Sequence, residues 1–203
     1  MNQTVLSPQP LHRPTSQSEV YRRYIPALNM DFSLQVASVE QHAAILTKWM
    51  NNPRVDKFWQ ESGDLTKQTQ YIQAQLDSAY SLPLIGYFED QAFAYFEVYW
   101  AKQDRIAPFY QCGDFDRGIH MLVGEEGHRG PHKVKAWLSS LVHYLFMQDS
   151  RTEVIVSEPR SDNEKMIHYL QKTGFCKLKE FDFPHKRAAL MHLERDEFFK
   201  HFS

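Results

Sequence analysis

Two ionisable side chains stand in or just after short apolar runs near the middle of the chain. His120 lies within GIHMLV (118–123), and Asp162 follows TEVIV (152–156). Both runs predict buried strands, and adjacent strands would bring the two side chains together. An imidazole with a near-neutral pKa can then act as a general base, while the carboxylate orients the imidazole or a substrate. The structural alternatives are a core histidine bonded to backbone and an acid that caps a helix.

A glycine-bearing loop follows the first of these runs. Gly124 and Gly130 bound it, and a proline then occupies the first position of an amphipathic helix. Strand, glycine loop and helix together aim backbone N–H groups at a phosphate. Arg129, His132 and Lys133 add positive charge for an anion. An ordinary loop between a strand and a helix is the alternative interpretation.

Four residues are candidates for the substrate side of a site. Phe58 and Trp59 stand together in an expected loop, where a structural anchor is the alternative role. Glu97 interrupts an apolar strand that ends at Trp100, so its carboxylate needs a partner or a function. A substrate ammonium is one possible partner and Arg105 is another.

The composition excludes several classes of protein. With 203 residues and a net charge of −2, the chain suits one domain and has no basic field to recruit nucleic acid. Its two cysteines, Cys112 and Cys176, suit a reducing compartment, and no apolar run reaches the ~18–20 residues of a membrane span. We therefore expect a cytoplasmic protein without membrane partners. His128 and His132 flank a Gly-Pro pair, so they share no helical face and we expect no metal site.

Apolar periodicity predicts a mixed α/β sheet of about seven strands flanked by about four helices. Residues 1–30, rich in polar residues and proline, are expected to be a flexible arm, and residues 31–203 one domain. The segment 51–64 is expected to be a loop. The expected strands are 32–36, 83–89, 91–100, 118–123, 152–156, 175–181 and 187–193. The expected helices begin after the cap Ser38, at residue 66, at Pro131 and after the cap Ser161.

Five long strings carry a resemblance to a known family. They are WMNNPRVDKFW (49–59), DFDRGIHMLVG (114–124), HRGPHKV (128–134), SEPRSDNEKMIHY (157–169) and FDFPHKRAALM (181–191). In addition, Asn163 opens the last helix and Gly174-Phe175 closes it. The chain resembles the GCN5-related N-acetyltransferase (GNAT) superfamily. It is most similar to the siderophore-biosynthetic branch, with its N-hydroxylysine acetyltransferases and mycobactin-type acyltransferases.

The resemblance implies a GNAT fold, acyl-coenzyme A as cosubstrate, and a small N-hydroxylated amine as acceptor, such as N6-hydroxylysine or a hydroxylated diamine. In that branch, the residues matching His120 and Asp162 are assigned to catalysis. Backbone N–H groups at Leu122 and Val123 would polarise the thioester carbonyl. The expected cofactor-binding residues are Leu122, Val123, Gly124, Arg129, Gly130, His132, Lys133 and Asn163.

The sequence also departs from the superfamily pattern. The loop after Arg129 lacks the two later small residues, and Leu170 stands where many relatives carry a tyrosine that protonates the thiolate. The coenzyme A thiolate would then leave as the anion. Two alternatives remain, an acetyltransferase for an ordinary amine and a non-catalytic acyl-coenzyme A-binding module. Association with a siderophore synthetase or an amine hydroxylase is a further expectation, and the oligomeric state stays open.

Overall fold

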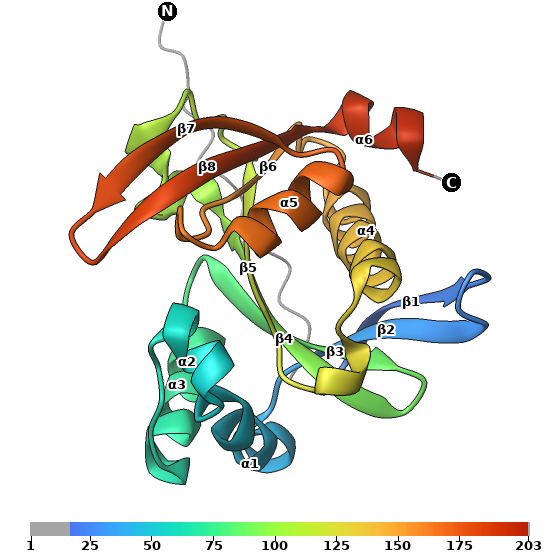
Figure 1. Cartoon of the computed structure of the whole chain (residues 1–203), viewed down its shortest axis with the longest axis vertical. Coiled ribbons are helices and arrows are strands. Elements are labelled where there is room, and N and C mark those ends of the chain that lie inside the picture. The colour runs from blue at the N-terminus through green and yellow to red at the C-terminus, as the bar shows by residue number, and fades with distance from the viewer. Residues whose placement is uncertain (1–16, 203) are drawn as a thin grey trace, which may run out of the picture.

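The computed structural model describes residues 17–202, which form one mixed sheet of eight strands with six α-helices (Figure 1). The strand order is β1-β2-β3-β4-β5-β6-β8-β7, and within residues 17–202 only β5 and β6 pair in parallel. The strands are β1 (Glu19–Ile25), β2 (Met30–Val36), β3 (Ser81–Phe88), β4 (Gln91–Trp100), β5 (Arg117–Val123), β6 (Val154–Ser157), β7 (Cys176–Phe183) and β8 (Lys186–Glu194). The helices are α1 (Val39–Met50), α2 (Pro53–Trp59), α3 (Leu65–Asp77), α4 (Pro131–Gln148), α5 (Glu164–Lys172) and α6 (Arg195–His201). The predicted fold class is confirmed, with one strand and two helices more than expected.

The boundary that we expected at residue 30 is wrong. Glu19–Ile25 form β1, which pairs antiparallel with β2 at the edge of the sheet. Most of its side chains are exposed or half-buried, so the segment lacks the apolar alternation that marks the other strands. Residues 1–16 of the expected arm lie outside the described residues.

Two seven-residue helices were also missed. The expected loop 51–64 contains α2, where the Asn52 side chain accepts from the Arg54 N–H at 3.0 Å and Pro53 occupies the first turn. The other is α6, which follows β8 directly and buries Phe198. Helices this short complete barely two turns, so a 3.6-residue apolar period cannot stand out in them.

The N-caps agree with the sequence at one helix and differ at another. Ser38 Oγ accepts from the Gln41 N–H at 3.2 Å, as the predicted capping pattern requires. At α5 the cap is Asn163, whose Oδ1 accepts from the Met166 N–H at 3.3 Å. The expected cap Ser161 instead uses its N–H to bind the carbonyl of Arg187 on β8. The helix therefore begins two residues later than a Ser161 cap implies.

Both faces of the sheet are covered. On one face, α4, α5 and α6 bury a core that includes Trp137 and Leu170. On the other, α1 and α3 cover part of the sheet (Figure 1). These two helices bury Trp49 and Ile72 against residues of β3–β5. Further along this second face, the 101–116 connection packs on the β7–β8 hairpin. The middle of the second face, between these helices and the hairpin, is left uncovered.

The parallel pair β5–β6 is the short seam of the sheet. Its register covers only two positions, Arg117 with Ile155 and Gly118 with Val156, and Ser157 Oγ adds one bond to the carbonyl of Ile119 at 3.1 Å. Beyond this point β5 pairs with β4 but no longer with β6. Because β5 pairs in register with β4, alternation turns the backbone groups of residues 121 and 123 toward the gap that β6 leaves.

Candidate active site

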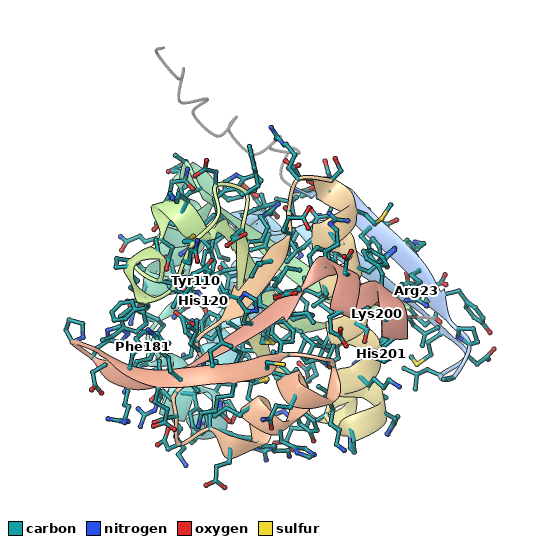
Figure 2. The ribbon with its side chains drawn as sticks, turned by 90° about the horizontal axis from the view of Figure 1, so that it is seen from above. Arg23, Tyr110, His120, Phe181, Lys200 and His201 are labelled. Atoms are coloured by element: carbon teal, nitrogen blue, oxygen red, sulfur yellow. The ribbon has the colours of Figure 1, made fainter. Side chains whose placement is uncertain are left out.

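A pocket of about 790 Å³ lies on the second face of the sheet. Its walls come from α2, α3, the 101–116 connection and the β7–β8 turn, and its floor comes from β4, β5 and the end of β6. The first turn of α5 lines the end nearest the seam. Figure 2 shows His120 inside the body of the chain, on the side of the labelled Tyr110 and Phe181. The fold thus gathers side chains from distant segments into one cavity.

His120 lies between two buried carboxylates on the pocket floor. Its Nδ1 is 3.0 Å from Oε2 of Glu97, and its Nε2 is 2.9 Å from Oε1 of Glu158. The β4–β5 register sets Glu97 directly opposite His120, and Glu158 directly follows β6. The side chains of Glu97 and Glu158 are 7% and 2% exposed, against 21% for His120. We call this arrangement the Glu97–His120–Glu158 chain.

The two carboxylates set the charge of the imidazole. Burial acts to lower the pKa of His120, but the charge of Glu158 and hydrogen bonds to both glutamates raise it to about 10. Burial acts to raise the pKa of Glu158, but the charge of His120 and its hydrogen bond hold it at about 2. Near neutral pH, the imidazole is therefore a cation whose two N–H groups both donate to carboxylates. In this state it has no lone pair for the base role that the sequence suggested.

Aromatic side chains hold Glu97 in place. Its Oε1 accepts from the Tyr71 hydroxyl at 2.5 Å and from the Tyr95 hydroxyl at 3.1 Å, and its Oε2 accepts from His120. The indole N–H of Trp59 donates to the Tyr71 oxygen at 3.2 Å. With three bonds accepted, Glu97 has little capacity for another proton donor.

Glu158 keeps one oxygen with spare capacity. Its Oε1 accepts from His120, while its Oε2 lies 3.6 Å from Nζ of Lys186, which also donates to the Glu158 carbonyl at 2.8 Å. Sequence reasoning missed Glu158, although a signal was present. Val156 and Glu158 are two apart, so continuing the alternation of β6 by two residues places the carboxylate on the same face of the sheet as His120.

The predicted contact between Asp162 and His120 is not formed. Asp162 is 54% exposed and its carboxylate binds the guanidinium of Arg160 at 2.9 and 3.0 Å. It lies past the end of β6, in the turn before α5, where strand geometry no longer directs its side chain. Its neighbour Asn163, a predicted cofactor-side residue, caps α5 and lines the pocket.

The aromatic candidates separate into two groups. Phe58 and Trp59 line the pocket from the end of α2, and the Trp59 ring meets the His120 ring edge-on at 6.3 Å between centroids. Trp100 is buried and stacks on the guanidinium of Arg117 at 4.3 Å, outside the pocket lining. It stands three residues after Glu97, so strand alternation places the two on opposite faces.

The loop after β5 is held against the strand by its own residues. The Gly124 N–H donates to the carbonyl of Phe93 at 2.9 Å, and a Cβ at Gly124 would collide with the indole of Trp49. Arg129, predicted to bind a phosphate, donates instead from Nη2 to the carbonyl of Val123 at 2.7 Å, with its side chain 17% exposed. In this structure Arg129 fastens the loop.

The helix after the loop begins without a side-chain cap. Gly130 occupies the N-cap of α4 at φ +130°, a backbone conformation that favours glycine. The N–H groups of His132 and Lys133 lie in the first turn, where a helix offers no internal acceptor. Lys133 Nζ donates to the carbonyl of Gly127 at 2.9 Å, and the His132 side chain is exposed. This end of α4 fits an anionic group such as a phosphate.

The β4–β5 pairing decides which strand N–H groups are available. Leu122 faces Tyr95 at a position where N–H and carbonyl bond across to β4, whereas residues 121 and 123 direct theirs into the gap. The Val123 N–H, which we expected to face a bound thioester, therefore points into the β5–β6 gap, whereas the Leu122 N–H points toward β4. The second N–H that points into the gap is that of Met121.

Residues 17–202 contain no group of three or more His, Cys, Asp or Glu side chains arranged to hold a metal. Among the same residues, no helix has the length and apolar character needed to cross a membrane. His128, one of the two histidines considered for metal, bonds Gln91 at 2.9 Å and stacks on Phe88.

Comparisons with known proteins show the family and the fold of the chain. A family model described as an acetyltransferase (GNAT) domain matches residues 38–183. An N(6)-hydroxylysine O-acetyltransferase of Escherichia coli is 44% identical over 190 residues, which are 94% of this chain and 60% of that protein. A hydroxyornithine transacylase of Ajellomyces capsulatus is 37% identical, over 93% of this chain and 43% of that protein. The chain thus spans about half the length of these curated relatives.

Solved structures share the fold. An uncharacterized protein from Bacillus halodurans has a TM-score of 0.85 and 28% identity, covering 92% of this chain and 95% of its own. An aminoglycoside acetyltransferase in complex with coenzyme A has a TM-score of 0.75 and 22% identity, covering 85% of this chain and 99% of its own.

Proposed function

Because the chain belongs to the GNAT acetyltransferase family, we propose that it transfers an acyl group from coenzyme A to the nitrogen of a small N-hydroxylated amine. The product is a hydroxamate. Relatives named for hydroxylysine and hydroxyornithine support this acceptor class.

The observation that carries the proposal is the position of the Glu97–His120–Glu158 chain beside the β5–β6 gap. A thioester lying in this gap would meet the N–H groups of Met121 and Val123, which can stabilise the oxyanion that forms on attack. An acceptor in the pocket would approach the same carbonyl from the side of Glu158. The thioester and the acceptor amine would thus meet between the backbone N–H groups of β5 and the carboxylate of Glu158.

Coenzyme A supplies the activated acyl group, and the chain fits it at two places. The uncapped first turn of α4, with the N–H groups of His132 and Lys133, would bind its phosphates. The β5–β6 gap would receive the thioester arm. Arg129 supports this binding indirectly by fastening the loop to Val123.

The proton balance favours Glu158 as the base. As the N–C bond forms, the acceptor nitrogen becomes cationic and strongly acidic, and one proton must leave before the C–S bond breaks and the thiolate departs. Within the Glu97–His120–Glu158 chain, Oε2 of Glu158 is the carboxylate oxygen with spare capacity to take that proton, even though the pKa of Glu158 is low. His120 holds both glutamates and keeps its positive charge beside them.

A hydroxylamine acceptor suits this site better than an alkylamine. Its nitrogen is already neutral and nucleophilic near pH 7, so the site need not first deprotonate an ammonium. The site offers no neutral imidazole for that task, because the pKa of His120 is raised to about 10. Leu170, at the position of the usual tyrosine acid, is buried, which leaves the thiolate to depart as the anion.

The test is a thiol-release assay with acetyl-, succinyl- and medium-chain acyl-coenzyme A against hydroxylated and plain amines. We expect turnover with N6-hydroxylysine and a product that forms a coloured ferric hydroxamate. Faster turnover of plain lysine or cadaverine would contradict the proposal and favour an ordinary amine acetyltransferase. Thiol release without the ferric colour would indicate transfer to oxygen. Coenzyme A binding without any turnover would indicate a non-catalytic module.

We further propose that the acceptor arises by N-hydroxylation of an amine, and that the hydroxamate passes to a siderophore synthetase. Such a route would place the protein in the cytoplasm, where acyl-coenzyme A is available. The relatives' names support the substrate class.

A further inference from the structure

The charged side chains that line the pocket are mostly paired. Each pair joins two groups within ion-pair distance: Glu97 and Glu158 with His120, Lys186 with Glu158, Glu61 with Lys67, and Arg160 with Asp162. The pKa of His185 is lowered by burial and by the charges of Arg105 and Lys186, so this side chain adds no charge near pH 7. These pairs leave no unpaired charge to bind the end of an acceptor that lies away from its reacting nitrogen.

Asp104 and Arg105 are the exceptions among the charged lining residues of the described chain. Neither forms an ion pair within residues 17–202. Asp104 Oδ1 accepts the Ile106 N–H at 3.0 Å, and its own N–H donates to the Ala101 carbonyl at 3.2 Å. Arg105 lies over the ring of Phe183 at 5.0 Å. The pocket therefore presents one carboxylate and one guanidinium, adjacent in sequence, on a turn that the hydrogen bonds of Asp104 hold in place.

A buried phenol lies in the same part of the pocket. Tyr99 lines the cavity, is 1% exposed, and its hydroxyl has no hydrogen-bond partner in the described residues. Its ring packs on that of His120 at 4.7 Å between centroids. Asp104, Arg105 and Glu158 all lie close enough for their charges to act on this phenol. A buried hydroxyl without a partner marks a place where a polar ligand group would be favourable.

We infer that Asp104 and Arg105 bind the zwitterionic head of an α-amino acid, while its N-hydroxylated side chain extends past Tyr99 to Glu158. Asp104 would bind the α-ammonium and Arg105 the α-carboxylate. Burial raises the pKa of Asp104, as expected for a carboxylate that still lacks its cation. The inference rests on the proposed function and narrows it, because a hydroxylated diamine has no carboxylate for Arg105. The acceptor is then an N-hydroxylated amino acid.

The test compares N6-hydroxy-L-lysine with N-hydroxycadaverine, which differs from it by the carboxylate. We expect the wild-type kcat/KM to favour the amino acid by about 10- to 100-fold, the range for hydrogen bonds to a charged group. Arg105→Gln should collapse this ratio to near unity, mainly by raising KM for the amino acid. Asp104→Asn should raise KM for both, because both carry the ammonium. The control is Lys102→Gln, an exposed lysine of the same connection that pairs with Asp114 and should leave the ratio unchanged.

A wild-type ratio near unity, or an Arg105→Gln effect equal for both substrates, overturns the inference while the proposed function stands. If no hydroxylamine is turned over, the proposed function fails, and calorimetry then tests the inference alone. With coenzyme A present, L-lysine should bind at least about 10-fold more tightly than cadaverine, and Arg105→Gln should remove the difference. Equal affinities, or no binding of either, overturn it.

Discussion

Replacing Glu158 by Gln tests the proposed chemistry most directly. The amide has nearly the shape of the carboxylate. Its carbonyl can still accept a hydrogen bond from Nε2 of His120, which lies 2.9 Å from Oε1 of Glu158 in the wild type. What is lost is the negative charge and the capacity to take a proton. The substitution thus separates chemistry from packing at a side chain that is 2% exposed.

The substitution should change two quantities, the kcat of the enzyme and the pKa of His120. Loss of a positioned base lowers kcat by roughly 10²–10⁴-fold, which corresponds to about 3–5 kcal/mol of activation free energy. The KM for acyl-coenzyme A should stay near that of the wild type, because the proposed phosphate and thioester sites are on α4 and β5. The charge of Glu158 is the largest contribution that raises the pKa of His120, so this pKa should fall in the variant.

The assay is saturating thiol release between pH 6 and 10, with the ionisation of the hydroxylamine measured separately. The wild-type imidazole stays protonated until about pH 10, whereas the residual rate of Glu158→Gln should rise with pH as the released imidazole titrates. Glu61→Gln is the matched control, because Glu61 also lines the pocket but pairs with Lys67 at 3.0 Å.

Two outcomes would refute this reasoning. One is a kcat for Glu158→Gln within a few-fold of the Glu61→Gln control, which would remove Glu158 from proton transfer. The other is a large loss of kcat with a matching rise in the KM for acyl-coenzyme A. That result would show that the variant disturbs the cofactor site.

Three further predictions concern the neighbouring residues. Asp162→Asn should leave kcat within about twofold in the same thiol-release assay, because its exposed carboxylate binds Arg160 and caps nothing. Asn163→Ala should lower the free energy of unfolding by about 1 kcal/mol in urea titrations, because it removes the N-cap of α5. Thermal stability should depend on pH through His120 and Glu158. The raised pKa of His120, about 10 against 6.5, stabilises the fold fully below pH 6.5, and this is lost as pH rises through about 10. The lowered pKa of Glu158, about 2 against 4.5, stabilises it fully above pH 4.5, and this is lost as pH falls through about 2. The melting temperature should therefore peak between about pH 4.5 and 6.5, and His120→Asn should flatten its alkaline side.

Much of the fold could be predicted because its main elements are long and periodic. The β3–β4 hairpin was expected within two residues of its bounds because its strands are apolar and buried along most of their length. The first residue of α4, Pro131, was also expected, because this helix has a long apolar period. β1 was missed because it lies at an edge and buries little. α2 was missed because a seven-residue helix rests on its cap and tertiary contacts more than on periodicity.

The site could be predicted only in part. His120 stands inside a clear strand, so alternation fixed its face, and the register then brought Glu97 opposite it. Asp162 was predicted in place of Glu158 because the sequence does not mark where β6 ends. The last residue whose side chain the strand still directs turned out to be Glu158, and Asp162 fell in the turn beyond.

The short β5–β6 seam also bears on how the chain folds. β1 to β5 follow the chain order within the sheet and pair antiparallel, and β6, β8 and β7 form a second block. The two blocks meet at a parallel pairing of two register positions, which must wait until α4 has crossed between them. We expect the seam to close late in folding and to open first in the native state. A ligand held across the gap would bind only the closed form, so it should slow hydrogen exchange in both blocks together.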